Sequence, residues 1–230
     1  MTAMAAIFKP DRAHVLADSA TCKLGNGRLH YFEMKIVRIK DIDAVVVIRG
    51  VRTCYHSFEM ACRETEFDSF DTLLDQLPAM IEHFGLSMFG LEGEVMLVGY
   101  SDARQKPVAV FLYDHDRGIE GLERGKLYFF DQGVVSFGFP PGAFPDAESF
   151  DVDQHAIPAF EAARQEPFDV SYGCNSGRRT MAHGIGGNVA HVELGRDFLR
   201  GDIVAQWPDR IGEKINPLEQ AERRSEALVV

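Results

Sequence analysis

The chain has 230 residues, of which 46% are hydrophobic and 26% charged, the composition of an ordinary globular protein. Its 24 basic and 35 acidic residues give a formal net charge of −11. A nucleic-acid-binding protein is expected to carry a basic stripe, so this balance argues against that class. An acidic surface favours solubility but indicates no particular partner.

The length fits one domain, which would bury roughly three quarters of the surface that its unfolded chain exposes. We expect this single domain over residues 1–215 and a charged C-terminal tail over residues 216–230. No apolar run approaches the about 18 residues that cross a bilayer, so no membrane partner is expected. The N-terminus lacks the basic segment and apolar core of a signal peptide.

Cysteine usage predicts a reducing compartment. None of the four cysteines belongs to a Cys-x-x-Cys pair. Scattered cysteines without a secretory leader are typical of free thiols in the cytoplasm, and they offer no zinc site. We therefore expect a cytoplasmic protein without a metal or other cofactor. The cysteines are Cys22, Cys54, Cys62 and Cys174.

Four short apolar runs in the first fifty residues predict buried strands. Each run is rich in β-branched or small residues and is bounded by turn or charged residues. The first two runs are joined by a turn in which Pro10 and Asp11 suit the central positions. A second turn signal, Gly25-Asn26-Gly27, predicts a loop or hairpin tip between the second and third runs. The runs cover residues 3–8, 13–18, 34–39 and 44–49.

Two consecutive helices are predicted next, and together they would cover one face of a sheet. The first begins near Thr53 and passes through Phe58 and Ala61 at helical spacing. The second begins at Asp68 or Ser69, and its apolar residues recur at steps of three or four as far as Phe84. Pro78 lies inside this second pattern and should bend the helix.

The middle of the chain returns to strands. Residues 94–100 and 107–113 are separated by a polar hexapeptide, which predicts a hairpin. Residues 126–131 and 134–139 lie on either side of Gln132-Gly133 and are predicted to form another pair. Ser136 is the nearest candidate here for lining a site, although an ordinary sheet serine is the favoured interpretation.

A third helix is predicted between Asp153 and Gln165, with Pro158 near its first turn. Residues 166–187 are rich in glycine and arginine, and we expect a short helix around residues 178–183, although the pattern assigns no role to this segment. Two strands, at residues 188–194 and 202–206, are predicted to close the fold.

Several motifs were weighed and set aside. The glycine-rich run from His183 to Gly187 resembles an oxyanion loop of α/β-hydrolases, but the chain has no Gly-x-Ser-x-Gly elbow. The same run fails as a dinucleotide motif because Val189 stands where the last glycine belongs. His183 and His191 have no carboxylate at metal-binding spacing. For the alternating Asp151, Asp153 and His155, helix capping is favoured over cation binding.

Four residues with a chemical use flank the N-terminal strands: Thr2, Asp18, Lys35 and Gly50. If Met1 is removed, the α-amine of Thr2 has an ordinary pKa near about 7.7–8.0 and can accept the proton of the Thr2 hydroxyl. Lys35 could lower the pKa of that hydroxyl or relay its proton, and Asp18 could orient Lys35. The backbone N–H of Gly50 could serve an oxyanion hole.

Residues 1–63 resemble the start of a proteasome β-type or HslV-like subunit, in the N-terminal nucleophile (Ntn) hydrolase superfamily. Such chains open with a catalytic Thr, continue to an Ala-Asp-Ser-like step, and then carry a Lys-Ile-x-Arg-Ile-like run and a strand that ends in Gly. Thr2, Asp18, Lys35 and Gly50 fall at matching positions, with Lys35 slightly offset. Beyond Glu64 the resemblance is one of layout.

The sequence also departs from that family. The opening Thr-Ala-Met-Ala lacks the second Thr that is frequent there. Arg49 and Arg52 stand near Gly50, where family members more often have small residues, and this bears on how a substrate would reach the site.

The resemblance implies an α+β fold of four layers, αββα, in which two antiparallel sheets are flanked by helices. It implies a threonine-type hydrolase of peptide or other amide bonds, with Thr2, Asp18, Lys35 and Gly50 as catalytic residues. It also implies a homo-oligomeric ring, and it leaves open whether an ATPase is a partner. Two alternatives remain: a non-catalytic assembly subunit that retains Met1, and an Ntn amidohydrolase of a small non-peptide amide.

Overall fold

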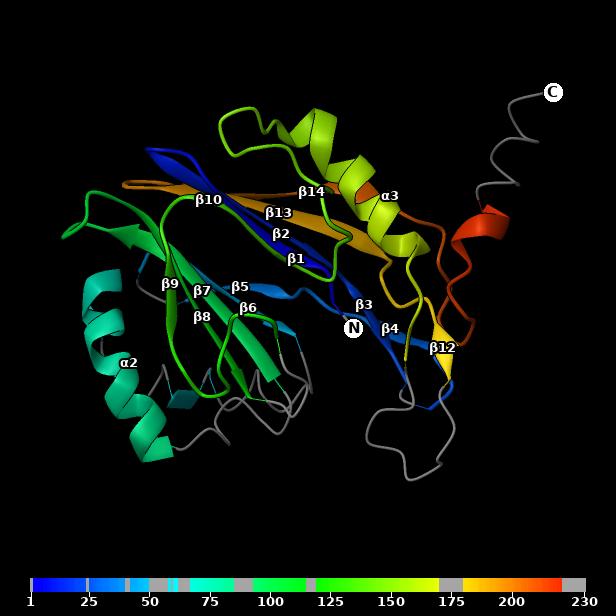
Figure 1. Ribbon diagram of the computed structural model, residues 1–230, viewed down its shortest axis with the longest axis horizontal. Coiled ribbons are helices and arrows are strands. Elements are labelled where there is room, and N and C mark those ends of the chain that lie inside the picture. Colours follow the sequence, from blue (N-terminus) through cyan, green and yellow to red (C-terminus); the bar gives the residue numbers. More distant parts are fainter. Residues whose placement is uncertain are drawn as a thin grey trace.

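Two five-stranded antiparallel sheets make up most of the structure, a computed structural model (Figure 1). It describes residues 2–23, 25–39, 42–49, 58, 60–61, 67–84, 93–114, 119–169 and 180–220. Sheet 1 has the order β10 (Gly133–Phe137), β1 (Met4–Phe8), β2 (Arg12–Asp18), β13 (Asn188–Gly195) and β14 (Leu199–Gln206). Sheet 2 has the order β5 (Ile36–Arg38), β6 (Ala44–Arg49), β7 (Gly93–Ser101), β8 (Lys106–Asp114) and β9 (Tyr128–Phe130).

Two small ribbons extend this framework. One pairs β3 (Ala20–Cys22) with β4 (Leu29–Phe32), and the other pairs β11 (Phe168–Asp169) with β12 (Met181–Ala182). The β3–β4 ribbon is the hairpin whose tip was predicted at Gly25-Asn26-Gly27.

The inner strands β1, β6, β7 and β8 are largely apolar on both faces because each sheet is covered on both sides. Successive side chains of a strand point to opposite faces. On β6, Ala44, Val46 and Ile48 pack with the helix α2 (Phe70–Phe84), whereas Val45 and Val47 pack between the sheets. This double burial explains why the strands appear in the sequence as continuous apolar runs rather than as alternating ones.

The helix α2 (Phe70–Phe84) covers the outer face of sheet 2 (Figure 1). It begins where the sequence indicates, because the Ser69 hydroxyl accepts a hydrogen bond from the Thr72 N–H at 3.1 Å and so caps the first turn. Leu73 and Leu77 lie one turn apart and are buried against the sheet. Pro78 lies inside the helix, at the position that the sequence pattern indicates.

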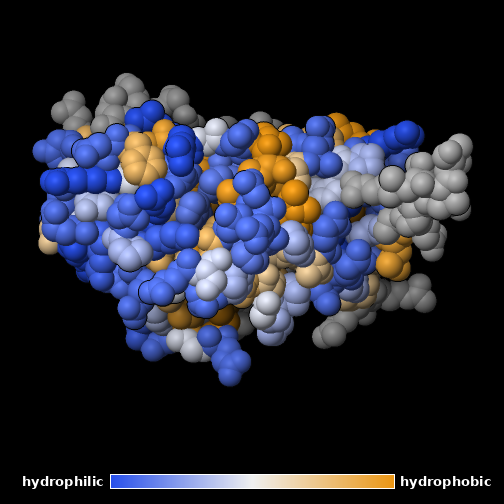
Figure 2. All heavy atoms as spheres, turned by 90° about the horizontal axis from the view of Figure 1, so that it is seen from above, coloured by the Kyte–Doolittle hydropathy of each residue, from blue (hydrophilic) through white to orange (hydrophobic). Residues whose placement is uncertain are grey.

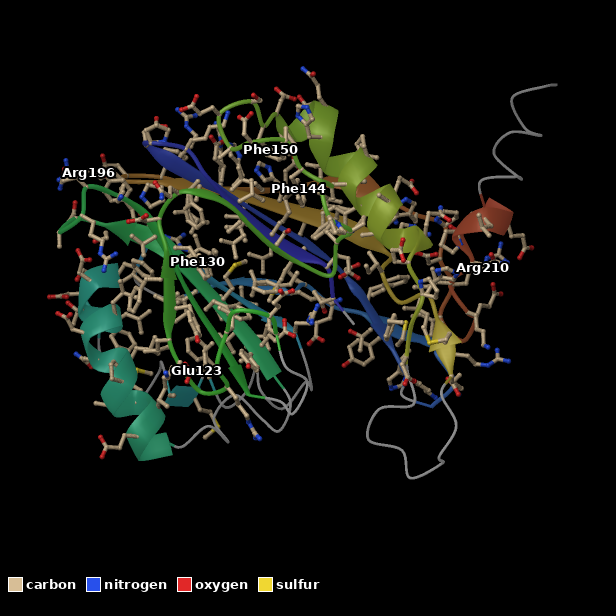
Figure 3. All side chains as sticks on the ribbon, viewed as in Figure 1. Glu123, Phe130, Phe144, Phe150, Arg196 and Arg210 are labelled. Carbon is tan, nitrogen blue, oxygen red and sulfur yellow. The ribbon has the colours of Figure 1, made fainter. Side chains whose placement is uncertain are left out.

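The outer face of sheet 1 is covered by a π-helical turn, η2 (Val152–Ala156), and the helix α3 (Ile157–Gln165). Asp151 accepts a hydrogen bond from the Gln154 N–H at 3.0 Å and so has the capping role that was favoured for it. Phe144 and Phe150 lie between this segment and the sheet (Figure 3). Seen from outside, this face is mostly hydrophilic, with apolar groups near its middle (Figure 2).

The α+β class and the dominance of antiparallel sheets are therefore confirmed. Helices are few: among the described residues, one long helix lies outside sheet 2, and η2 with α3 lies outside sheet 1. The helix predicted from Thr53 falls mostly outside the described residues, although Phe58, Met60 and Ala61 are helical. None of the helices that are described combines the length and the apolar character needed to span a membrane.

Two predictions for the second half of the chain are wrong. Residues 126–131 and 134–139 do not form a hairpin, because β9 pairs with β8 in sheet 2 while β10 pairs with β1 in sheet 1. The chain passes from one sheet to the other at Gly133, whose φ of +73° suits glycine. Residues 181–182 form a strand instead of a helix, because they pair with β11.

Loss of a buried side chain from α2 should lower the free energy of unfolding. Leu73 is fully buried, so Leu73→Ala should cost about 2–5 kcal/mol. Ile211 is 62% exposed, and Ile211→Ala should cost less than about 0.5 kcal/mol. Urea unfolding measures both losses, provided that the slope of the unfolding free energy against urea concentration is the same in the variants and in the wild type. Equal losses would show that α2 does not pack as described.

Candidate functional site

The chain enters sheet 1 through Thr2 and Ala3, directly opposite the end of β2. The register of β1 and β2 places Met4 beside Ala17, and the Asp18 N–H donates to the Ala3 carbonyl at 3.2 Å. Thr2 is 4% exposed. The pairing of the first two strands therefore brings Asp18 next to the start of the chain, as the sequence predicts.

The Asp18 carboxylate is fully buried and accepts hydrogen bonds from four segments of the chain. Its Oδ1 accepts from the Ala3 N–H and from Lys35 Nζ, both at 3.0 Å. Its Oδ2 accepts from the Ala20 N–H at 3.1 Å and the Gly186 N–H at 3.2 Å. A buried carboxylate is costly unless it is paired and hydrogen-bonded, and here both oxygens are satisfied.

Lys35 is buried as well, at 4% exposure, and precedes β5. Its ammonium donates to Asp18 Oδ1 and, at 2.6 Å, to the Ala20 carbonyl. Because Asp18 Oδ1 also accepts the Ala3 N–H, one oxygen joins Lys35 to the residue that follows Thr2.

Two residues outside the predicted catalytic set hold the backbone of Thr2. Arg49, at the end of β6, donates to the Thr2 carbonyl at 3.5 Å and forms an ion pair with Glu94. Gly138 packs on the same carbonyl: a Cβ there would lie 2.8 Å from it, and φ is +80°. A side chain is therefore excluded at Gly138. A glycine inside the strand predicted at residues 134–139 is the sequence signal that could have identified it.

The remaining candidates lie elsewhere or outside the description. Gly50 falls outside the described residues, although Arg49 directly before it is near Thr2. Ser136 is exposed on β10, opposite Ala5, which agrees with an ordinary sheet serine. The glycine-rich run near residue 186, set aside as an oxyanion loop, supplies an N–H to Asp18 instead.

The arrangement places a buried positive charge beside the first residues of the chain. An ammonium held by a carboxylate in a low-dielectric pocket stabilises negative charge that develops nearby more strongly than it would in water. The chemistry that this permits is activation of a hydroxyl or stabilisation of an anionic intermediate at Thr2.

A second buried polar cluster lies farther along the same strands. His14 on β2 and His191 on β13 are stacked, with His14 Nδ1 3.1 Å from His191 Nε2. Burial, and then the nearby His191, lower the pKa of His14 from 6.5 to about 4. Burial lowers the pKa of His191 too. The neutral forms of both histidines are therefore favoured at pH 7.

Comparison with solved structures finds the same fold in a protein of low sequence identity. A structure titled Anbu (Gly-1) mutant from Hyphomicrobium sp. strain MC1 superposes with a TM-score of 0.61 at 11% identity, and the match covers 100% of this chain and 95% of that chain. No protein-family model matches the chain. No curated protein matches it either.

These findings correct the resemblance to a proteasome β-type or HslV-like subunit. A chain of that group was expected, but the structural match is with Anbu, and no family model supports the assignment. At 11% identity the likeness shows a shared fold and no more. The family assignment drawn from residues 1–63 is therefore wrong.

Removal of the Lys35 ammonium should destabilise the fold strongly, because Asp18 would remain as a buried charge without a counter-ion. Lys35→Met keeps most of the side-chain volume and should lower the free energy of unfolding by about 3–5 kcal/mol. The matched control is Arg38→Met, which breaks the exposed pair with Asp43 and should cost less than about 1 kcal/mol. Denaturant titration compares the two, and similar losses would contradict burial of the Lys35–Asp18 pair.

The histidine pair should make the fold sensitive to acid. Unfolded His14 takes up a proton near pH 6.5, whereas folded His14 does so only at about pH 4. Between these values the unfolded state binds more protons, so stability is complete above pH 6.5 and falls as the pH falls, by at most about 1.4 kcal/mol per pH unit for one proton. His14→Gln should flatten this dependence in pH-dependent urea unfolding.

The control for that experiment is His30→Gln, which removes an exposed histidine from β4. An unchanged slope in His14→Gln would show that His14 does not stay neutral in the folded state.

Proposed function

We propose that the protein is a threonine-type hydrolase that cleaves peptide or related amide bonds, with Thr2 as nucleophile after removal of Met1. The single observation that carries the proposal is the buried Lys35–Asp18 pair, which is hydrogen-bonded to the backbone directly after Thr2. The fold shared with the Anbu structure is consistent with it. The catalytic set is Thr2, Asp18, Lys35 and Gly50.

The proposed reaction begins at the Thr2 hydroxyl. Its oxygen attacks the carbonyl carbon of the scissile amide, and its proton passes to the free α-amine of the same residue. The tetrahedral intermediate expels the amine product, which takes that proton, and leaves an ester on Thr2. Water then hydrolyses the ester and restores the hydroxyl. An amide nitrogen cannot accept the proton, so the mechanism requires that no residue precedes Thr2.

The other members of the set have electrostatic roles. Lys35 favours the alkoxide form of Thr2 and stabilises the negative charge of the intermediate. Asp18 keeps Lys35 charged and fixes its direction through the shared oxygen. Gly50 follows Arg49, which donates to the Thr2 carbonyl, and we assign its N–H to the oxyanion of the substrate.

The same proposal includes the assembly. We assign residues 1–215 to one Ntn-type domain with four αββα layers and residues 216–230 to a tail, in a homo-oligomeric ring in the cytoplasm. The shared fold supports this part. The apolar clusters support it as well, because α2 packs on sheet 2, sheet 2 on sheet 1, and sheet 1 on α3.

One observation favours a second candidate, a non-catalytic assembly subunit. Thr2 is only 4% exposed, whereas a nucleophile has to meet its substrate. A protein that keeps Met1 would use the Lys35–Asp18 pair to anchor its N-terminal strand instead of to activate a hydroxyl.

Intact mass and an amide reporter distinguish the two candidates. If Met1 is absent and the proposal holds, Thr2→Ala should lose about three to six orders of magnitude in turnover, the range that follows deletion of a nucleophile. Thr2→Ser should retain activity because it keeps the hydroxyl, and Lys35→Ala should abolish turnover.

Blocking the removal of Met1 should be as damaging as Thr2→Ala. A protein that carries Met1 quantitatively and still cleaves the reporter would overturn the N-terminal nucleophile mechanism. A protein that carries Met1 and is inert would establish the assembly candidate in its place.

A further inference from the structure

A buried arginine is connected to the Lys35–Asp18 pair through the backbone of Gly186 and Gly187. Arg164, on α3, is 1% exposed. Its Nη1 donates to Asp209 Oδ2 at 2.9 Å and to the Ile185 carbonyl at 3.0 Å, and its Nη2 donates to Asp209 Oδ1 at 3.2 Å and to Gln220 Oε1 at 2.8 Å. Its guanidinium lies over the Trp207 ring, 4.2 Å from the centroid. Both terminal nitrogens of the guanidinium are thus fixed in direction.

Asp209 is the hub of this cluster. Besides the two bonds from Arg164, it accepts from Gln220 Nε2 at 2.9 Å and from the Gly187 N–H at 2.8 Å. Burial alone would raise the pKa of Asp209, but the hydrogen bonds and charge of Arg164, with further hydrogen bonds, outweigh burial and hold that pKa below its usual range. The carboxylate is therefore ionised in the folded protein and holds the Gly187 peptide.

The two glycines connect this cluster to the candidate site. The Gly187 N–H donates to Asp209, and the N–H of Gly186, one residue earlier, donates to Asp18 Oδ2 at 3.2 Å. The Gly186 carbonyl accepts from the N–H groups of Ser19 and Ala20, at 3.2 and 3.1 Å. Consecutive peptides are thus held by two different buried carboxylates.

Glycine is required at residue 186 by this close approach. A Cβ there would lie 2.4 Å from Asp209 Oδ2 and 2.9 Å from Arg164 Nη1. Any side chain at Gly186 would push the ion pair away from the peptide that bonds to Asp18. This requirement gives a role to the glycine-rich run that the sequence displays between His183 and Gly187.

The cluster is suited to fixing the positions of the groups that it joins, although it contributes little to the free energy of unfolding. Desolvation of two charges offsets most of their attraction, so a buried ion pair generally adds little net stability. Its directional hydrogen bonds nevertheless permit one arrangement only. The arrangement that they fix here includes the Gly186 N–H on Asp18.

We propose that Arg164, Asp209 and Gln220 form a positioning cluster, which holds the Gly186 N–H on Asp18 and thereby sets Lys35 relative to Thr2. The consequence for catalysis rests on the function proposed above; the effect on Asp18 does not. None of the three touches the reacting atoms, so they are positioning residues. Gln220 lies near the end of the described chain, so the cluster also joins the segment after Asn216 to the site.

The experiment compares Asp209→Ala and Gly186→Ala with two matched controls. Glu193→Gln alters a different buried carboxylate, which lies in sheet 1 away from the site and binds two arginines, Arg12 and Arg200. Gly201→Ala adds a Cβ where the nearest atom is 3.4 Å away. The first measurement is amide hydrogen exchange at Gly186 and Gly187 in the full chain. The second is the separation of kcat from KM on the amide reporter.

Asp209→Ala should accelerate exchange at the Gly187 amide by roughly ten- to hundredfold, because this amide loses its hydrogen bond to a charged group. Exchange at the Gly186 amide should accelerate as well, because its peptide is no longer held in place against Asp18. Amides of β6 in sheet 2 should be unaffected, which separates a local effect from general destabilisation. The same variant should lower kcat by roughly ten- to hundredfold, with KM little changed, because the reacting groups are misplaced while substrate contacts remain. Gly186→Ala should lower kcat similarly, and both controls should behave as the wild type.

Unchanged exchange at Gly186 in Asp209→Ala would overturn the proposal, as would a fall in kcat no larger than in the controls. If Asp209→Ala does not fold, Gln220→Ala removes one donor and one acceptor and should shift the same amides in the same direction. An inert wild-type protein would sink the proposed hydrolase function instead, and exchange would still decide whether the cluster positions Asp18.

Discussion

The burial of the Asp18 carboxylate is the constraint on which the N-terminal half of the structure depends. It is an ionisable group with 1% exposure, and such a group is tolerated only when its charge is paired and its lone pairs are filled. Four donors meet this requirement, from the start of β1, from β3, from the residue before β5 and from the segment before β13. Each donor comes from a segment that the fold must bring to one point. The cost of burying one carboxylate therefore specifies where Thr2, Lys35 and Gly186 lie relative to each other.

The two-sided burial of the sheets has a similar consequence for position. Because β1 packs against sheet 2 on one face and against α3 on the other, a slip by one residue would exchange the side chains of the two faces and disturb the packing on both. The register of β1 with β2 fixes Ala3 opposite Asp18, and the register with β10 fixes Gly138 over the Thr2 carbonyl. The start of the chain is thus located by packing at a distance from it, not by its own few contacts alone.

This double burial also decides what the sequence could predict. The strands at residues 3–8, 13–18 and 44–49 were predictable, because a strand covered on both faces is a short continuous apolar run. Asp18 and Lys35 could be paired from their places at strand ends. The partner of a strand is not encoded locally, so the separation of β9 and β10 into different sheets was missed. The link from Arg164 to Asp209 spans 45 residues and has no local signature, and the glycines that it holds resembled a motif of another fold.

Thr2 is nearly buried, but what this means for the two candidate functions depends on which of its atoms make the contacts. The Thr2 carbonyl accepts from Arg49 and lies against Gly138, while the Ala3 N–H is bound to Asp18. These contacts involve the carbonyl side of Thr2, and none of them uses its amine or its hydroxyl. None of these contacts involves the residue before Thr2, so they remain available after its loss. A nucleophile held in this way needs no reorganisation to react, since the geometry is established by the rest of the fold. In the proposed mechanism the removal of Met1 would then free the amine that accepts the proton.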